Sequence, residues 1–269
     1  MKTANAAGDQ RKYPVCYPPN PLQNTPPPIG WARLHAVSHQ PQFTHTMYIQ
    51  PVVMMDFETT GMSPALGDRV TEVAALRIVG GVVVERFVSL INCDVRISPF
   101  ISQLTGITQS MVDRAPPVEQ VMPELVRFIG NDALAAHNVS FDEKFLLAES
   151  ARLGIVPTHA GVICSVKLSR RVFPGLRSYA LGALASSLGI RFNGNAHRAE
   201  ADAEVASAVM LHIAAHLGQQ YGIREVDPRF LQQINRLTAA KVPAFLQRPA
   251  APAIGQVNGT VRRRKSGII

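Results

Sequence analysis

A short apolar run that ends in two acidic residues constrains the fold of this chain more than any other feature. Residues 52–55 are all apolar, as is typical of a strand buried on both faces of a sheet. Asp56 and Glu58 follow, and because strand side chains alternate, both point to the face opposite Phe57. Paired carboxylates at the end of a core strand are costly unless a cation, such as a hard divalent metal, compensates them. The run predicts a central strand with a metal site at its end; a solvated strand end is the alternative.

Length, cysteine content and hydropathy limit the class of protein. The chain has 269 residues, of which 46% are apolar, which is enough for one sizeable core with extensions or at most two domains. Cys16, Cys93 and Cys164 lack metal-ligand spacing, which argues against a disulfide framework or a zinc site and suits a reducing compartment. No apolar run has the length of a membrane span, and residues 1–30 lack the apolar segment of a secretory signal. We therefore expect a cytoplasmic protein without membrane contact.

The formal net charge of +8 is spread unevenly and divides the chain into three parts. Residues 1–46 carry a net charge of +3 and are rich in proline, residues 47–221 carry −2, and residues 222–269 carry +7. We expect these parts to be a disordered extension, a catalytic domain, and an amphipathic helix with a basic tail. The basic run at 262–265 can bind phosphates or be a solvated terminus. Met47 stands just before the first strand, so one hypothesis is that the natural product starts there.

From residue 47 onward the pattern alternates between strands and helices, which predicts an α/β fold. Gly80 and Gly81 mark a hairpin turn, and Ser140 with Glu143 forms a capping box that starts a helix. The expected strands are 51–58, 70–79, 82–91, 133–136 and 162–164, and the expected helices are 118–129, 140–152, 178–188 and 199–217.

A further helix is expected near the C-terminus. It begins at Asp227 and Pro228, whose residue types are common at an N-cap and in the first helical turn. Its apolar residues form one stripe, made of Phe230, Leu231, Ile234 and Leu237. We expect this stripe to pack back onto the core, and binding of a partner is the alternative.

Two other segments place acidic residues close to histidines. His137 ends a buried strand, and Asp142 lies in the first turn of the following helix, where an acidic residue also suits the helix dipole. His197 and Asp202 lie at the start of the long helix. Five helical residues would leave these two about 140° apart around the helix. Both can therefore face one site only if His197 lies on the loop before the helix and Asp202 lies on the helix itself.

Together, the segments 56–61, 137–142 and 197–202 resemble, in order and spacing, the three motifs of the DEDD exonuclease superfamily. The histidine in the third motif indicates the DEDDh or DnaQ-like variant, typified by the epsilon proofreading subunit of bacterial DNA polymerase III. The variant with a tyrosine would need it where this chain has Arg198. The segment 104–108 also resembles the Thr/His-Gly-Ile segment that the family carries between its first two motifs.

The resemblance implies a ribonuclease H-like fold, with a five-stranded mixed sheet flanked by helices, over residues 51–217. It also implies that two divalent ions, Mg²⁺ or Mn²⁺, bind four carboxylates and that His197 takes the proton from the attacking water. The four carboxylates are those of Asp56, Glu58, Asp142 and Asp202. Thr59, Leu104 and Thr105 are expected to hold the terminal nucleotide.

The chain departs from the family pattern in two places. An Asp-Thr pair that often stands on the last strand is replaced here by Cys164 and Ser165, which leaves the expected metal ligands intact. The C-terminal segment shows no clear clamp-binding sequence of the Gln-x-x-Leu type just after the core. The assignment to the exonuclease family is therefore stronger than an assignment to a replicative proofreading subunit.

We predict a metal-dependent 3′→5′ exonuclease that releases nucleoside 5′-monophosphates from single-stranded or frayed DNA ends in proofreading or repair. A DNA polymerase catalytic subunit is the expected protein partner. RNA 3′-end trimming is the alternative, since RNA-trimming relatives share all five catalytic residues. A non-hydrolysing polymerase accessory subunit would be expected to lack one or more of the carboxylates. A metal-dependent glycosyltransferase would use the first motif and leave the other two without a purpose.

Overall fold

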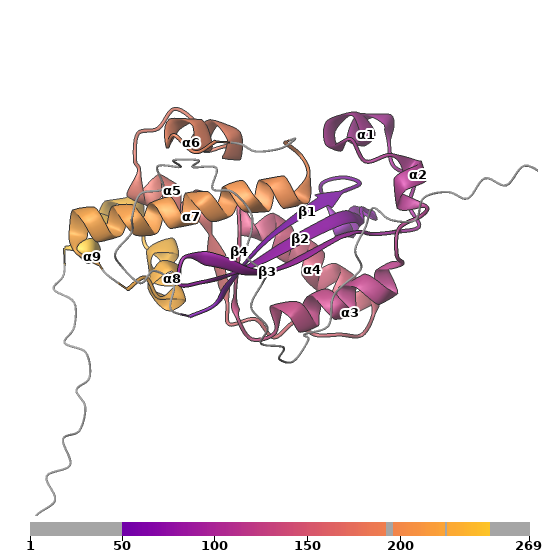
Figure 1. Ribbon diagram of the computed structural model, residues 1–269, viewed down its shortest axis with the longest axis horizontal. Helices are drawn as coiled ribbons and strands as arrows, with labels where there is room; N and C mark the ends of the chain where they lie inside the picture. Colours follow the sequence, from indigo (N-terminus) through magenta and orange to yellow (C-terminus); the bar gives the residue numbers. More distant parts are fainter. Residues whose placement is uncertain (1–49, 192–195, 224, 248–269) are drawn as a thin grey trace, which may run out of the picture.

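A five-stranded mixed sheet forms the centre of the molecule (Figure 1). The computed structural model describes residues 50–191, 196–223 and 225–247, so the predictions for residues 1–46 and for the basic run at 262–265 lie outside the described residues. The strands are β1 (Val52–Thr59), β2 (Val70–Val79), β3 (Val82–Leu90), β4 (Ala133–Ala136) and β5 (Val162–Cys164), in the spatial order β3-β2-β1-β4-β5. The predicted strand boundaries are correct to within one residue.

Strand β1 lies in the middle of the sheet, as its apolar run predicts. It pairs antiparallel with β2 and parallel with β4, while β3 and β5 form the two edges. Its side chains alternate between two hydrophobic clusters: Val52 and Met54 belong to one, and Val53, Met55 and Phe57 belong to the other. By the same alternation, the two acidic residues that follow point to the first cluster's side of the sheet.

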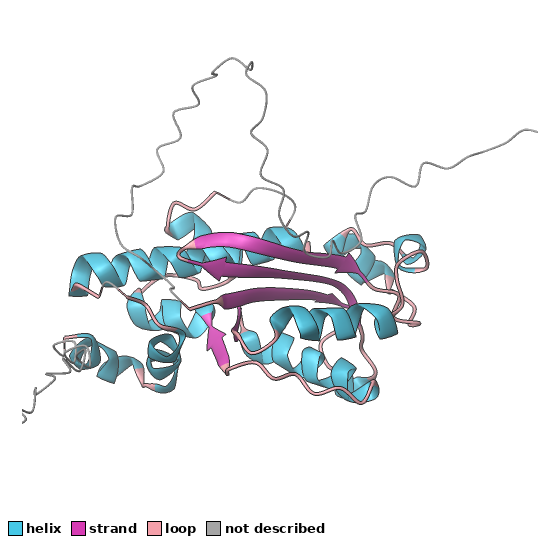
Figure 2. Ribbon diagram, turned by 60° about the horizontal axis from the view of Figure 1, so that its bottom comes forward, coloured by secondary structure: helices cyan, strands magenta, loops and turns pink. Residues whose placement is uncertain are grey.

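Helices cover both faces of the sheet (Figure 2). The helices of the described residues are α1 (Pro99–Thr105), α2 (Gln109–Val112), α3 (Val118–Ile129), α4 (Val139–Arg152), α5 (Ser165–Val172), α6 (Leu181–Ser187), α7 (Ala199–Tyr221), α8 (Pro228–Arg236) and α9 (Val242–Leu246), with short 3₁₀ helices η1 (Pro64–Leu66) and η2 (Ala239–Lys241). The long helix α7 packs on one face, with Ala203 and Met210 in the same cluster as Val52. Helices α3 and α4 pack on the other face through Leu125 and Phe145.

Two predicted helix starts are wrong. Helix α4 does not begin with a capping box at Ser140, because its N-cap is Asn138, which has a left-handed backbone (φ 76°) and makes no side-chain cap. Ser140 lies inside the first turn, and its hydroxyl donates to the Asn138 side chain. Only two residues separate β4 from α4, so the sharp turn at Asn138 moves the helix start forward. Ser178 likewise caps no helix, since α6 begins at Leu181.

The C-terminal helix α8 packs against the core, as expected. The Asp227 side chain accepts a hydrogen bond from the Arg229 amide, and Pro228 occupies the first turn. Leu231 and Ile234 are fully buried in the cluster beneath α7. Helices α1, α2, α5 and α9 were not predicted, since all four are too short to show a clear helical period. In the part of the chain that the structure describes, no helix has both the length and the apolar character needed to span a membrane.

Candidate active site

A cleft opens at the carboxyl end of β1, and every site residue predicted from the sequence lines it. These residues come from four parts of the chain: Asp56, Glu58 and Thr59 from β1, Leu104 and Thr105 from α1, Asp142 from α4, and His197 and Asp202 from the loop before α7 and its first turn. The fold thus gathers the three motifs and the 104–108 segment around one space. Their chemical roles stay predictions.

The carboxylate pair of the first motif is set by the end of β1. Asp56 and Glu58 are half-buried, and their side chains leave the same face of the strand. A shift in the β1–β2 register follows Glu58, and the Thr59 hydroxyl donates to the Gly61 carbonyl at 2.6 Å. Any side chain at position 61 would collide with the carboxylate of Asp68, whose atoms lie 2.4–2.5 Å from the place of a Cβ. A side chain here would therefore have to displace the Asp68 carboxylate, which accepts a hydrogen bond from the Ser63 amide at 2.9 Å.

Asp142 is brought to the pair by the short β4–α4 connection. Its side chain is only 2% exposed and accepts a hydrogen bond of 3.1 Å from the Phe57 backbone amide. Phe57 stands between Asp56 and Glu58, so the contact holds the first turn of α4 against the acidic end of β1. A favourable interaction of Asp142 with the helix dipole, which its position in the sequence suggests, does not by itself account for this tertiary contact.

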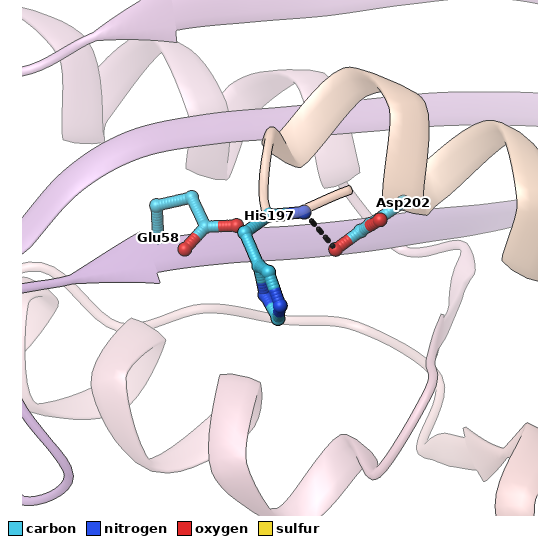
Figure 3. A group of neighbouring side chains, drawn as sticks. All are labelled: Glu58, His197 and Asp202. Carbon is cyan, nitrogen blue, oxygen red and sulfur yellow. Dashed lines mark hydrogen bonds between the residues drawn. The ribbon is translucent and has the colours of Figure 1, made fainter. Parts of the chain in front are cut away.

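His197 lies on the loop before α7 and Asp202 lies on the helix, which is the arrangement that the helical geometry requires. His197 has a left-handed backbone (φ 63°), and its amide donates to the Asp202 carboxylate at 3.3 Å. Figure 3 shows Glu58 and Asp202 on either side of His197. One potential ligand atom from each of these three side chains lies within 4.8 Å of the others. Residues of the third motif therefore lie beside Glu58 of the first motif, on the face of the sheet that α7 covers.

Without a cation, the surroundings of the four carboxyl groups favour their protonated forms. Burial raises the pKa of Asp56 well above its usual value, with added repulsion from Asp142 and Asp202. Burial also raises the pKa of Glu58 to about 8 and that of Asp142 to about 8. The pKa of Asp202 is raised by burial as well, against the opposing effect of His197. Such a set of crowded, desolvated carboxyls gains most from a bound cation.

The donor set fits a hard divalent ion. Carboxylate oxygens are the ligands that Mg²⁺ and Mn²⁺ prefer, and four of them line the cleft. Among the residues that the structure describes, the close group of possible ligands contains Glu58, His197 and Asp202. Asp56 and Asp142 line the same cleft outside that close group. The arrangement supports metal binding by its chemistry, with Glu58 and Asp202 as the carboxylates of the close group.

His137 serves the scaffold of the cleft. Its ring nitrogens are 2.8 Å from the Ser165 hydroxyl and 3.0 Å from the Tyr179 carbonyl oxygen. Burial lowers its pKa, so the ring is neutral, donates from Nε2 to the carbonyl and accepts at Nδ1 from the hydroxyl. Ser165 thus keeps a hydroxyl partner for the histidine of the second motif, although it departs from the threonine of the family pattern.

Three further residues of interest were missed from the sequence. Met62 and Phe100 line the cleft with exposed side chains, and an exposed apolar residue looks like a core residue in a sequence. Glu72 is 3% exposed near the start of β2. The signal for Glu72 in the sequence was an acidic residue inside a mostly apolar strand.

Solved structures share this architecture. Exonuclease X, solved in complex with 5′-overhanging duplex DNA, is 26% identical to this chain, with a TM-score of 0.53. The likeness covers 68% of this chain and 99% of that one. The sheet, its flanking helices and the acidic cleft define a ribonuclease H-like exonuclease domain.

Sequence comparisons specify the family. Residues 53–210 match the RNase_T exonuclease family model. The epsilon subunit of DNA polymerase III from Aquifex aeolicus is 34% identical over 171 residues, which cover 64% of this chain and 84% of the subunit. The 3′-5′ exonuclease DinG of Bacillus subtilis is 38% identical over 189 residues, which cover 70% of this chain but only 20% of DinG. The chain belongs to the DnaQ-like 3′→5′ exonuclease family.

Proposed function

We propose that this protein is a metal-dependent 3′→5′ exonuclease that removes nucleoside 5′-monophosphates from single-stranded or frayed DNA ends. The observation that carries the proposal is the convergence of four carboxylates and His197 in one cleft of an exonuclease domain. Catalysis is assigned to residues 47–221, which include the whole match to the family model.

Asp56, Glu58, Asp142 and Asp202 would hold two Mg²⁺ or Mn²⁺ ions. When bound, such ions compensate the carboxylates and stabilise the charge on the attacking and leaving oxygens of an in-line phosphoryl displacement. The raised pKa values of these carboxyls support the assignment, because a group that is costly to ionise alone becomes favourable to ionise beside a cation.

His197 would act as the general base. Its exposed side chain stands at the mouth of the cleft, and its own amide is fixed to Asp202. An imidazole nitrogen can take the proton from the attacking water and later pass it to solvent. The proximity of this ring to Glu58 and Asp202 also permits metal ligation, but a base needs access to solvent and a metal ligand does not.

Thr59, Leu104 and Thr105 would position the terminal nucleotide. Thr105 is 4% exposed, and its hydroxyl accepts a hydrogen bond from the Ile107 amide. Leu104 is 41% exposed and offers an apolar surface for a base or sugar. The three residues line the same cleft as the carboxylates, which supports their assignment to the nucleotide next to the proposed metal ions.

DNA is favoured over RNA on the basis of the relatives. The epsilon subunit is a component of a DNA polymerase, and Exonuclease X was solved with DNA. A polymerase catalytic subunit is accordingly the proposed protein partner. Since the chain spans only a fifth of DinG, the biological setting of DinG is not transferred to it.

Degradation of matched 5′-labelled single-stranded DNA and RNA with Mg²⁺ tests the proposal. We expect a ladder that shortens from the 3′ end of the DNA, nucleoside 5′-monophosphates as products, and no ladder with the folded Asp56→Ala variant. A ladder formed mainly on RNA would transfer the function to RNA trimming. A folded wild-type protein inactive on both strands with Mg²⁺ or Mn²⁺ would contradict the proposed activity.

A further inference from the structure

Glu72 lies directly opposite Glu58 on the neighbouring strand. The register of β1 and β2 pairs the two glutamates, so their side chains share the face that α7 covers. Two like charges in this relation repel each other, and Glu72 is 3% exposed. A buried carboxylate in such a place needs strong partners of its own.

The partners of Glu72 are the two residues that follow His197. The Arg198 guanidinium donates to both carboxylate oxygens, from Nε at 3.0 Å and from Nη2 at 2.6 Å. The Ala199 amide, the first of α7, donates to the same carboxylate at 3.0 Å. A paired fork of this kind fixes orientation as well as distance. The N-cap residue Arg198 makes no capping hydrogen bond with its own side chain. Glu72, on β2, caps the first amide of α7 instead.

His197 is held from both sides by these contacts. Its own amide binds Asp202, and the next two residues bind Glu72. Between the two anchors, its backbone is left-handed (φ 63°), a conformation that a non-glycine residue keeps only where its surroundings impose it. The anchors thus account for a strained conformation at the residue that presents the imidazole to the cleft.

We propose that Glu72 and Arg198 are positioning residues that hold residues 196–198, here called the His197 loop, in their active conformation. The inference rests on the proposed function, in which His197 is the general base. The pair acts through His197: Glu72 gives Arg198 and the Ala199 amide a fixed acceptor on the sheet, which fixes His197, the residue before Arg198, beside Glu58. A displaced base would lower the rate of the chemical step without weakening the binding of the DNA end.

The variants Arg198→Ala, Arg198→Lys and Glu72→Gln test this inference against the control Arg86→Ala. Arg86 on β3 also ties the sheet to the first turns of α7, through Glu200 and Glu204 at 3.2 and 2.6 Å. It has no contact with the His197 loop among the hydrogen bonds found in the described residues. Arg86→Ala therefore removes nearby ion pairs between a strand and a helix and leaves the contacts of Glu72 with Arg198 and Ala199 intact.

Steady-state kinetics on single-stranded DNA provide the first readout. Arg198→Ala is expected to lower kcat by about 10- to 100-fold, since misplacing a catalytic group by about 1 Å can cost 100-fold, with KM changed by less than about twofold. Arg198→Lys should recover part of the loss, and Arg86→Ala should leave kcat unchanged. In the His197→Ala background, Arg198→Ala should cause no further loss, because the base it positions is absent.

Amide hydrogen exchange of the metal-free protein provides a readout that needs no activity. Residues 196–202 should exchange faster in Arg198→Ala and Glu72→Gln than in the wild type or Arg86→Ala. The inference is overturned if Arg198→Ala raises KM with kcat unchanged, which would make Arg198 a DNA-binding residue. It is also overturned if the loss of kcat is equal with and without His197, or if exchange is unchanged. An inactive wild type would contradict the proposed function, and the exchange experiment would still test whether Glu72 and Arg198 hold the His197 loop.

Discussion

The carboxylate of Asp142 accepts a hydrogen bond of 3.1 Å from the backbone amide of Phe57, across 85 positions of sequence. Phe57 stands between Asp56 and Glu58, so this bond joins the second motif to the first. It leaves the side chains of Asp56 and Glu58 unused. The strand end is thus set relative to α4 before any ligand binds. A carboxylate that also has a structural bond offers a way to separate folding from catalysis by substitution.

The variant Asp142→Asn is expected to fold and to lose hydrolysis. Its amide oxygen can still accept from the Phe57 amide, so the structural bond survives while the charge is lost. Loss of one proposed metal ligand should lower kcat/KM at least about 10³-fold. Thermal unfolding without metal should occur at the same temperature or higher, since a buried carboxyl of raised pKa is removed. Asp113→Asn, at an exposed position, is the control, and activity within tenfold of the wild type in Asp142→Asn would exclude Asp142 as a ligand.

The variant His197→Ala is expected to lower kcat by about 10²- to 10⁴-fold, the usual contribution of a general base. KM for single-stranded DNA should change little, because the imidazole contacts water in the proposed role and not the DNA strand. Single-turnover measurements with saturating Mg²⁺ check that the chemical step is affected. An unchanged single-turnover rate would show that another group removes the proton.

The stability of the metal-free protein should fall as the pH rises. The folded pKa of Glu58 is about 8 and its ordinary value is 4.5, so the folded state binds more protons than the unfolded state between these values. Stability is therefore highest at the acidic end of this window and is lost, by a few kcal/mol in order of magnitude, as the pH rises through about 8. Thermal unfolding in a chelator at pH 5.5, 7.0 and 8.5 measures the trend.

Mg²⁺ should counteract the loss of stability at high pH, because it binds the ionised carboxylates and displaces their protons. We expect the increase in melting temperature on adding Mg²⁺ to be larger at pH 8.5 than at pH 5.5. The variant Glu58→Gln should flatten the dependence on pH in the chelator. A melting temperature that rises with pH in the chelator, with the same slope in Glu58→Gln, would contradict the assigned shift.

Much of the fold could be predicted because local patterns and buried runs agree. The apolar run before Asp56 identified the central strand, and the apolar segment ended by His137 identified β4. The left-handed turn at Asn138 was not predictable, since asparagine is common in many kinds of turn and the capping residues at Ser140 offered a plausible local alternative. The role of Glu72 was hidden for a different reason. Its partner Arg198 is 126 positions away, and no local pattern reports a tertiary contact.

The side chain of Asn235 on α8 pairs with the free edge of β5 as another strand would. Its oxygen accepts from the Cys164 amide at 2.7 Å, and its nitrogen donates to the Cys164 carbonyl at 3.2 Å. Asn235→Ala should destabilise the protein by about 1–3 kcal/mol, because both backbone groups lose their partner in a partly buried place. Since Cys164 lies outside the cleft, kcat should stay within about threefold of the wild type.

Chemical denaturation of Asn235→Ala, with Gln232→Ala as the control, measures this contribution. Gln232 lies on the same helix and donates a single, exposed hydrogen bond to the Ala160 carbonyl at 2.9 Å, so its loss should cost less than about 1 kcal/mol. An equal effect of the two variants would show that the Asn235 side chain does not hold α8 more strongly than an exposed hydrogen bond does. A large loss of kcat in folded Asn235→Ala would instead connect α8 to the site through Ser165, which follows Cys164 and bonds His137.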